Sequence, residues 1–122
     1  MQGRSVKRRH TQLTVWRDSI ALVKRVYELT GDLPKQELFG LISQMRRAAV
    51  SVASNIAEGS ARDGDKEFLR FLYIARGSLA ELETQNIICE QLTFIQAGTL
   101  SEDMERVYAK LSALINARKA RL

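Results

Sequence analysis

A line of polar residues crosses the otherwise small and apolar stretch RRAAVSVASNIAEGSAR at residues 46–62. These residues recur every three or four positions, which places them on one side of a helix. Such a line could serve catalysis, bind a ligand through its arginines, or form a structural hydrogen-bond network. Because each unsatisfied buried polar group costs about 1–3 kcal/mol, we expect a network that reaches the following helix. Its predicted members are Arg47, Ser51, Asn55, Glu58, Arg62, Arg76, Ser78 and Glu81.

The sequence offers few groups for catalysis. His10 is the only histidine, which excludes a histidine-based triad or a two-histidine zinc site within one chain. Cys89, the only cysteine, falls on an apolar helical stripe and is expected in the core. Glycine-rich phosphate loops are absent. We therefore predict no enzymatic activity, no catalytic residues, no metal and no cofactor; a metal site built from carboxylates alone is the remaining alternative.

Basic residues point to a different function. The 122-residue chain has a formal net charge of +5, with four cations in residues 1–13 and three in residues 118–122, so the body is net negative. Such ends often bind nucleic acid or other acidic surfaces, and the alternative is that they are solvated termini. The predicted nucleic-acid-binding residues are Arg4, Lys7, Arg8, Arg9, Arg46, Arg47, Arg62, Lys66 and Arg70.

Four segments repeat apolar residues at helical spacing, and only one proline and 7% aromatic residues are present. We predict an all-α fold, an up-down-up-down four-helix bundle over residues 14–122, preceded by a flexible basic tail at residues 1–13. Gly31 is expected to end the first helix in a left-handed conformation, and the second helix is expected to begin near Pro34. The apolar stripe predicted for the first helix is Trp16, Ile20, Val23 and Tyr27.

The second predicted helix has two apolar faces, whereas a monomeric bundle needs one. The extra face indicates either a crowded central position in the subunit or a subunit interface. Its residues, the predicted interface, are Phe39, Val50, Ala53, Ala57 and Ala61. Gly77, inside the third helix, is expected where another helix approaches closely.

Three stretches carry a family resemblance: VWRDSIALVKRVYELTGDLP at 15–34, LISQMRRAAVSVASNIAEGSAR at 41–62 and EFLRFLYIARGSLAELETQ at 67–85. Together they resemble the S23-like four-helix-bundle proteins encoded in intervening sequences of bacterial 23S rRNA genes. The resemblance implies a homopentamer without established enzymatic activity. The accessory variability proteins of diversity-generating retroelements, which bind nucleic acid and the reverse transcriptase, are similar. This similarity implies that the second apolar face of the second helix lies between subunits.

These observations lead to a functional prediction. We expect a non-enzymatic, homo-oligomeric bundle that binds RNA or DNA electrostatically. The alternative is an oligomeric scaffold for a protein partner, such as a reverse transcriptase or another nucleic-acid enzyme, without direct nucleic-acid binding. The single cysteine and the lack of an apolar run of about 18 residues predict a cytoplasmic protein with no membrane partner.

Overall fold

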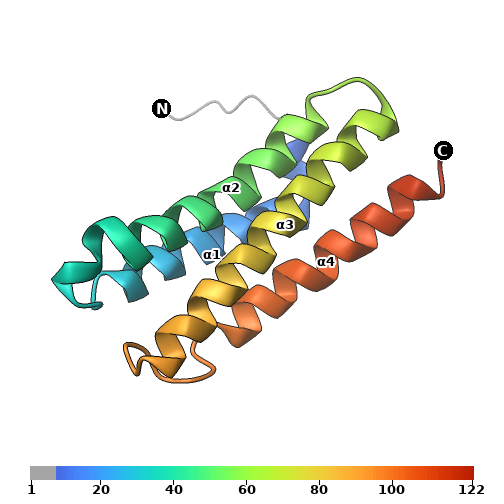
Figure 1. The fold of residues 1–122 in the computed structure, drawn as a ribbon. Helices are drawn as coiled ribbons and strands as arrows, with labels where there is room; N and C mark the ends of the chain where they lie inside the picture. Colours follow the sequence, from blue (N-terminus) through green and yellow to red (C-terminus); the bar gives the residue numbers. More distant parts are fainter. Residues whose placement is uncertain (1–7) are drawn as a thin grey trace.

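The computed structural model describes residues 8–122, which form four long α-helices. The helices are α1 (Thr14–Thr30), α2 (Ser43–Ser60), α3 (Gly64–Gln91) and α4 (Ser101–Lys119). They lie side by side and run alternately in opposite directions (Figure 1). The part of the chain that the structure describes contains no strand. The predicted all-α, up-down-up-down four-helix bundle is therefore confirmed.

The connection between α1 and α2 differs from the prediction. Gly31 has φ −62°, so the end of α1 is not left-handed. Two short elements come before α2: a 3₁₀ turn, η2 (Lys35–Glu37), and a π-helical turn, η3 (Leu38–Ile42). Gly40 leaves helical geometry inside η3, with φ −110° and ψ −111°. Since glycine favours the helix less than every residue except proline, the regular helix begins at Ser43 rather than near Pro34.

The segment before α1 packs against the bundle. A 3₁₀ turn, η1 (His10–Gln12), leads into α1. Leu13 packs against the core, and the ring of His10 meets that of Trp16 edge-on, with centroids 4.9 Å apart. These contacts attach residues 10–13 to the bundle. The predicted binding residues Arg4 and Lys7 lie outside the described residues.

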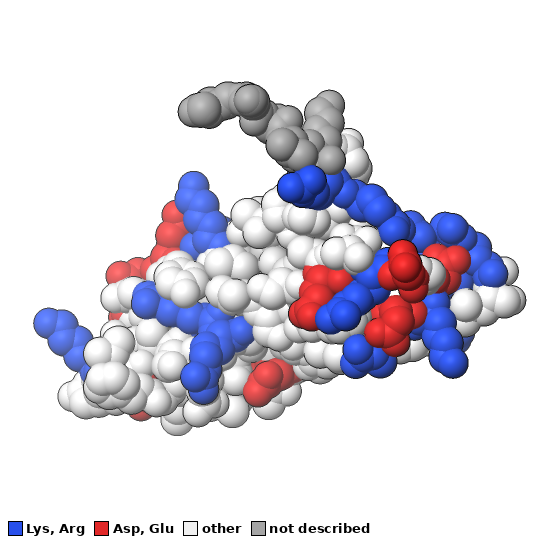
Figure 2. Space-filling model, turned by 90° about the horizontal axis from the view of Figure 1, so that it is seen from above, with Lys and Arg blue, Asp and Glu red and all other residues white. Residues whose placement is uncertain are grey.

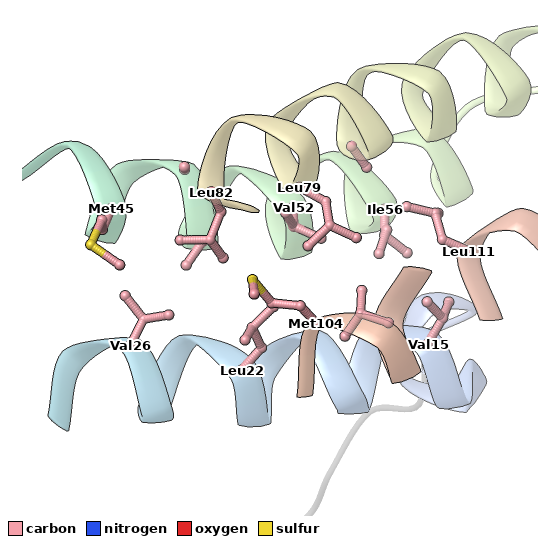
Figure 3. Packing of buried hydrophobic residues seen from close by; sticks show 14 of the residues in the cluster. Val15, Leu22, Val26, Met45, Val52, Ile56, Leu79, Leu82, Met104 and Leu111 are labelled. Carbon is pink, nitrogen blue, oxygen red and sulfur yellow. The ribbon is translucent and has the colours of Figure 1, made fainter. Parts of the chain in front are cut away.

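All four helices contribute side chains to one core along the bundle axis (Figure 3). The side chains that meet there include Leu22, Val26, Val52, Ile56, Leu79, Leu82, Met104 and Leu111, each 6% exposed or less. Among residues 8–122, no helix combines the length and the hydrophobicity that crossing a membrane requires.

The apolar stripe predicted for α1 is wrong in part. Ile20 and Tyr27 are each 44% exposed. The buried residues of α1 are Val15, Ser19, Leu22, Val26 and Thr30. Ser19 and Thr30 are tolerated there because their hydroxyls donate 2.6 Å hydrogen bonds to backbone carbonyls of Trp16 and Val26. The predicted stripe lies on a neighbouring face of α1 because the prediction considered only apolar side chains.

Helices α2 and α3 approach each other closely at a glycine that our sequence-based prediction did not single out. A Cβ atom on Gly59 would lie 2.6 Å from Cβ of Phe71 and 3.0 Å from Cδ1 of Phe68. A Cβ atom on Gly77 would meet no atom within 4 Å among residues 8–122. The close contact predicted at Gly77 is therefore absent from the described chain, and Gly59 makes it instead.

Candidate nucleic-acid interface

Two parts of the chain that are far apart in sequence meet beside the C-terminal end of α2. Arg8, Arg9 and His10 lie there next to Arg62, around a hollow of about 380 Å³ whose lining also includes Ala57 and Ala61. We call it the arginine hollow. Arg8 and Arg9 are exposed, and within residues 8–122 neither guanidinium has a carboxylate at ion-pair distance. Three of the predicted nucleic-acid-binding residues therefore share one site.

Aromatic rings of α3 support the arginines at this end of the bundle. The guanidinium of Arg9 stands 5.9 Å from the ring centroid of Phe68, and that of Arg62 stands 5.0 Å from that of Phe71. Both rings are buried, at 2% and 6% exposure. A cation over an aromatic face is attracted by the ring quadrupole, so the rings hold the two guanidiniums in place.

The basic residues at the start of α3 are largely neutralised. Arg62 pairs with Glu58 at 2.8 Å, and Arg70 pairs with Glu67 at 3.2 Å. The hydrogen bond from Arg70 is the main reason why the pKa of Glu67 lies below its usual range. Lys66 is exposed beside them. The two paired arginines add little net charge to the surface, in contrast to Arg8, Arg9 and Lys66, which form no ion pair within residues 8–122.

The neighbouring residues Arg46 and Arg47 play different roles. Arg46 donates a 2.9 Å hydrogen bond to Oγ1 of Thr30 and a 3.3 Å bond to the carbonyl of Tyr27, at the C-terminal end of α1. Its guanidinium also lies 4.5 Å from the ring centroid of Tyr27. The side chain of Arg47 is exposed and forms no hydrogen bond or ion pair within residues 8–122. Arg46 therefore stabilises the end of a helix, and Arg47 is available to a ligand.

Part of the predicted polar network is formed. The hydroxyl groups of Ser51 and Ser78 are 2.7 Å apart and join α2 to α3. Asn55 donates to the carbonyl and the hydroxyl of Ser51, at 2.9 and 3.0 Å. The pair between Glu58 and Arg62 lies further along α2. The network thus connects α2 to α3 through the hydrogen bond between Ser51 and Ser78.

Three predicted members of the network are not bonded to it within residues 8–122. Arg76 lies over the ring of Tyr73 instead, 5.3 Å from its centroid. Arg47 and Glu81 line one hollow together with Ser51, yet the two charges form no ion pair. Their predicted structural role is corrected accordingly.

Two salt bridges at the same end of the bundle, between the start of α3 and the C-terminal segment, were not predicted. Asp65, in the first turn of α3, pairs with Arg118 at 3.1 Å and with Arg121 at 3.0 Å. The acid and the basic cluster are both visible in the sequence, but only the antiparallel packing of α3 and α4 brings them together. The C-terminal charges are therefore partly compensated within the chain.

The predicted interface residues differ in availability. Phe39 is 92% exposed and Val50 is 40% exposed. Ala61 is exposed and Ala57 is half-buried, but Ala53 is only 5% exposed and already packs within the chain, so it is removed from the candidate interface. In Figure 2 an uncharged area lies between two groups of charged side chains, and each group contains both basic and acidic residues.

The model of one protein family, described as 23S rRNA-intervening sequence protein, matches residues 11–117. The chain belongs to this family. A comparison with curated proteins finds no match. The family match begins inside η1, so it includes Arg62 and excludes Arg8, Arg9 and His10 from the arginine hollow.

Cys89 is a core residue of this chain. Its Sγ lies 3.6 Å from Sδ of Met45, and the side chain is fully buried. Burial is the main reason why the pKa of its thiol is raised, with smaller effects of Glu37 and Glu90, so the nucleophilic thiolate is disfavoured. Residues 8–122 contain no group of three or more histidine, cysteine or acidic residues placed to hold a metal ion.

Proposed function

We propose that this protein is a non-enzymatic homo-oligomer that binds RNA or DNA through the phosphate backbone. The observation that carries the proposal is the presence of three exposed guanidiniums, those of Arg8, Arg9 and Arg47, without a carboxylate partner within residues 8–122. These arginines lie at two places beside the second apolar face of α2. Arg47 shares a hollow with Val50, and Arg8 and Arg9 share another with Ala57 and Ala61.

Binding of this kind would be electrostatic and tolerant of sequence. Phosphate contacts by arginine fix the position of a nucleic acid without reading its bases. A few such contacts on one chain give weak binding, and a homo-oligomer repeats them, which raises the overall affinity through multivalency. Assembly and binding therefore support each other in this proposal.

The proposed assembly is a homopentamer that uses the exposed apolar residues of η3 and α2. Phe39 is the strongest candidate anchor, because a 92% exposed phenylalanine leaves nearly its whole ring in water. Light scattering should give a mass five times that of the 13.8 kDa chain. Phe39→Asp should produce smaller species with unchanged helicity. Tyr108→Asp, at an exposed position on α4, is the matched control.

The binding proposal is tested by fluorescence polarisation with RNA and DNA, single-stranded and duplex, over a series of salt concentrations. The double variant Arg8→Gln/Arg47→Gln removes two unpaired cations and should reduce the slope of log K against log salt on duplex DNA by up to about 1.8. Lys24→Gln/Lys35→Gln removes the same charge from exposed positions elsewhere and should change the slope less. Absence of binding at low salt would end the proposal.

A second candidate function is a scaffold for a protein partner, such as a reverse transcriptase. It is favoured by exposed apolar residues on the outer side of α3, where Tyr73, Ile74, Ile87 and Ile88 are 42 to 54% exposed. This alternative predicts that Ile88→Asp abolishes co-elution with the purified partner enzyme. It also predicts that the protein alone does not bind nucleic acid.

A further inference from the structure

We propose that the arginine hollow binds a phosphate monoester on a nucleotide, either at the 5′ end of a nucleic-acid strand or on a free mononucleotide. The inference rests on the proposed nucleic-acid binding, because it names the part of the nucleic acid that this surface would hold. It concerns Arg8, Arg9, His10 and Arg62, which the fold brings to one place.

The size of the hollow suits a nucleotide. Its volume of about 380 Å³ falls near the lower end of the range for small-molecule sites, roughly 300–1,000 Å³. Ala57 and Ala61 contribute only methyl groups to its lining, beside the long side chains of the three arginines. A single nucleotide fits a cavity of this size, whereas a length of duplex would contact only its rim.

The charge of the lining favours a monoester over a diester. Arg8 and Arg9 present two guanidiniums without carboxylate partners in the described chain, and Arg62 adds a third that also bonds Glu58. A phosphate monoester carries about −1.5 to −2 charges at neutral pH and three acceptor oxygens. A diester in the middle of a strand carries one charge, so the end of a strand is attracted more strongly.

Two of the donors are positioned before any ligand arrives. Arg9 and Arg62 stand over the buried rings of Phe68 and Phe71, and the imidazole of His10 rests against Trp16. Restricting side chains in advance lowers the entropy that binding would otherwise cost. The hydroxyl of Ser60, also in the lining, donates to the carbonyl of Ala57 at 2.9 Å and is less available to the ligand.

Substitution of Asp63 is expected to change phosphate affinity in the direction opposite to substitution of the arginines. Its carboxylate also lines the hollow and would repel a phosphate. Asp63→Asn should therefore tighten binding, while Arg9→Gln and Arg62→Gln should weaken it. A purely structural role of these residues does not predict effects of opposite sign.

The experiment compares a 5′-phosphorylated single-stranded oligonucleotide with the same strand ending in a 5′-hydroxyl, by fluorescence polarisation with the full chain. A second arm compares adenosine 5′-monophosphate with adenosine by calorimetry. We expect the phosphate to improve affinity about tenfold in at least one arm, as the loss of one charge-assisted contact implies. The arm that responds identifies the source of the phosphate.

Variants then locate the effect. The side chain of Arg8 forms no hydrogen bond or ion pair within residues 8–122, so Arg8→Gln should reduce the preference for phosphate without lowering Tm. Lys35→Gln, an exposed cation at the other end of the bundle, is the control and should leave the preference unchanged. Circular dichroism verifies that Arg9→Gln and Arg62→Gln remain folded; if either unfolds, the result for Arg8→Gln decides.

The outcomes separate this inference from the proposed function. If both oligonucleotides bind equally and adenosine 5′-monophosphate does not bind, nucleic-acid binding stands and the phosphate site is refuted. If no nucleic acid binds but adenosine 5′-monophosphate does, the proposed function fails and the hollow is a mononucleotide site. If neither binds at low salt, both are refuted.

Discussion

The arginines at the two ends of α2 differ in the groups that their guanidiniums contact. At the N-terminal end, Arg46 is bonded to the last turn of α1, while the side chain of Arg47 has no hydrogen-bond or ion-pair partner within residues 8–122. At the C-terminal end, Arg9 and Arg62 stand over buried phenylalanines and line a hollow. The comparison teaches that the number of cations in a segment says little about binding. What matters is whether a carbonyl, a carboxylate or only an aromatic ring faces each guanidinium.

The difference has a simple geometric origin. Successive residues of a helix point about 100° apart, so Arg46 faces α1 while Arg47 points to the solvent beside it. At the other end, Gly59 lets α3 approach α2 closely enough to bring Phe68 and Phe71 against its backbone. The ring of Phe71 then lies below Arg62. The arginine at the N-terminal end of α2 thus contacts the C-terminus of α1, whereas the arginines at its C-terminal end contact the rings of Phe68 and Phe71.

The largest effect is expected from filling the contact that builds the second end. Gly59→Ala would place its Cβ 2.6 Å from Cβ of Phe71, and close to backbone and ring atoms of Phe68. Overpacking of this kind should lower stability by about 1–3 kcal/mol, more than the gain in helix propensity. Thermal unfolding followed by circular dichroism measures it. A Tm equal to the wild type would show that the two phenylalanines do not depend on Gly59.

At the first end, Arg46→Gln should cost about 1 kcal/mol, because the carbonyl of Tyr27 and the hydroxyl of Thr30 lose a charged donor. Arg47→Gln is the control and should change stability by less than about 0.5 kcal/mol. Chemical denaturation of both variants provides the comparison. Equal losses for the two substitutions would contradict the assignment of Arg46 as structural and Arg47 as available.

A glycine between the two ends tests whether close packing is confined to Gly59. Gly77→Ala adds a methyl group where no atom lies within 4 Å in the described chain. The change should stabilise α3 by up to about 1 kcal/mol, the difference in helix propensity between the two residues. Tm and the assembly mass should be measured together. A lower Tm or a smaller assembly would indicate that another subunit packs against Gly77.

The smallest effect concerns a carboxylate outside both arginine regions. Burial, and to a lesser degree the charge of Glu105, raise the pKa of Glu83 in the folded protein. Ionised Glu83 therefore destabilises the fold, and this cost appears as the pH rises through the carboxylate range. Glu83→Gln should raise stability at pH 7 by up to about 0.5 kcal/mol. The difference from wild type should vanish below pH 4, where both side chains are neutral.

The sequence predicted the helices better than their faces and ends. Regular spacing of apolar residues indicated four helices because a long amphipathic pattern has few other solutions. The face of α1 was misjudged because Ser19 and Thr30 are buried with their hydroxyls bonded to the backbone. The start of α2 was misjudged because Gly40 interrupts the helix after a favourable proline.

For the candidate site, the sequence named Arg8, Arg9 and Arg62 but assigned them to a tail and a loop. Nothing local to either segment relates them, because about fifty residues of helix and turn lie between them. The sequence also could not separate Arg46 from Arg47, which are adjacent and chemically identical. Their roles depend on which helix packs beside α2.

The sequence by itself determined the fold class and the supply of charged side chains, since apolar periodicity and composition are properties of the chain. Only the tertiary structure decided which charges remain available. Side-chain partners such as Glu58 for Arg62 follow from spacing along one helix, whereas Asp65 meets Arg118, and Arg9 meets Phe68, only after the helices have packed. Such contacts depend on distances in space, which the order of residues does not state.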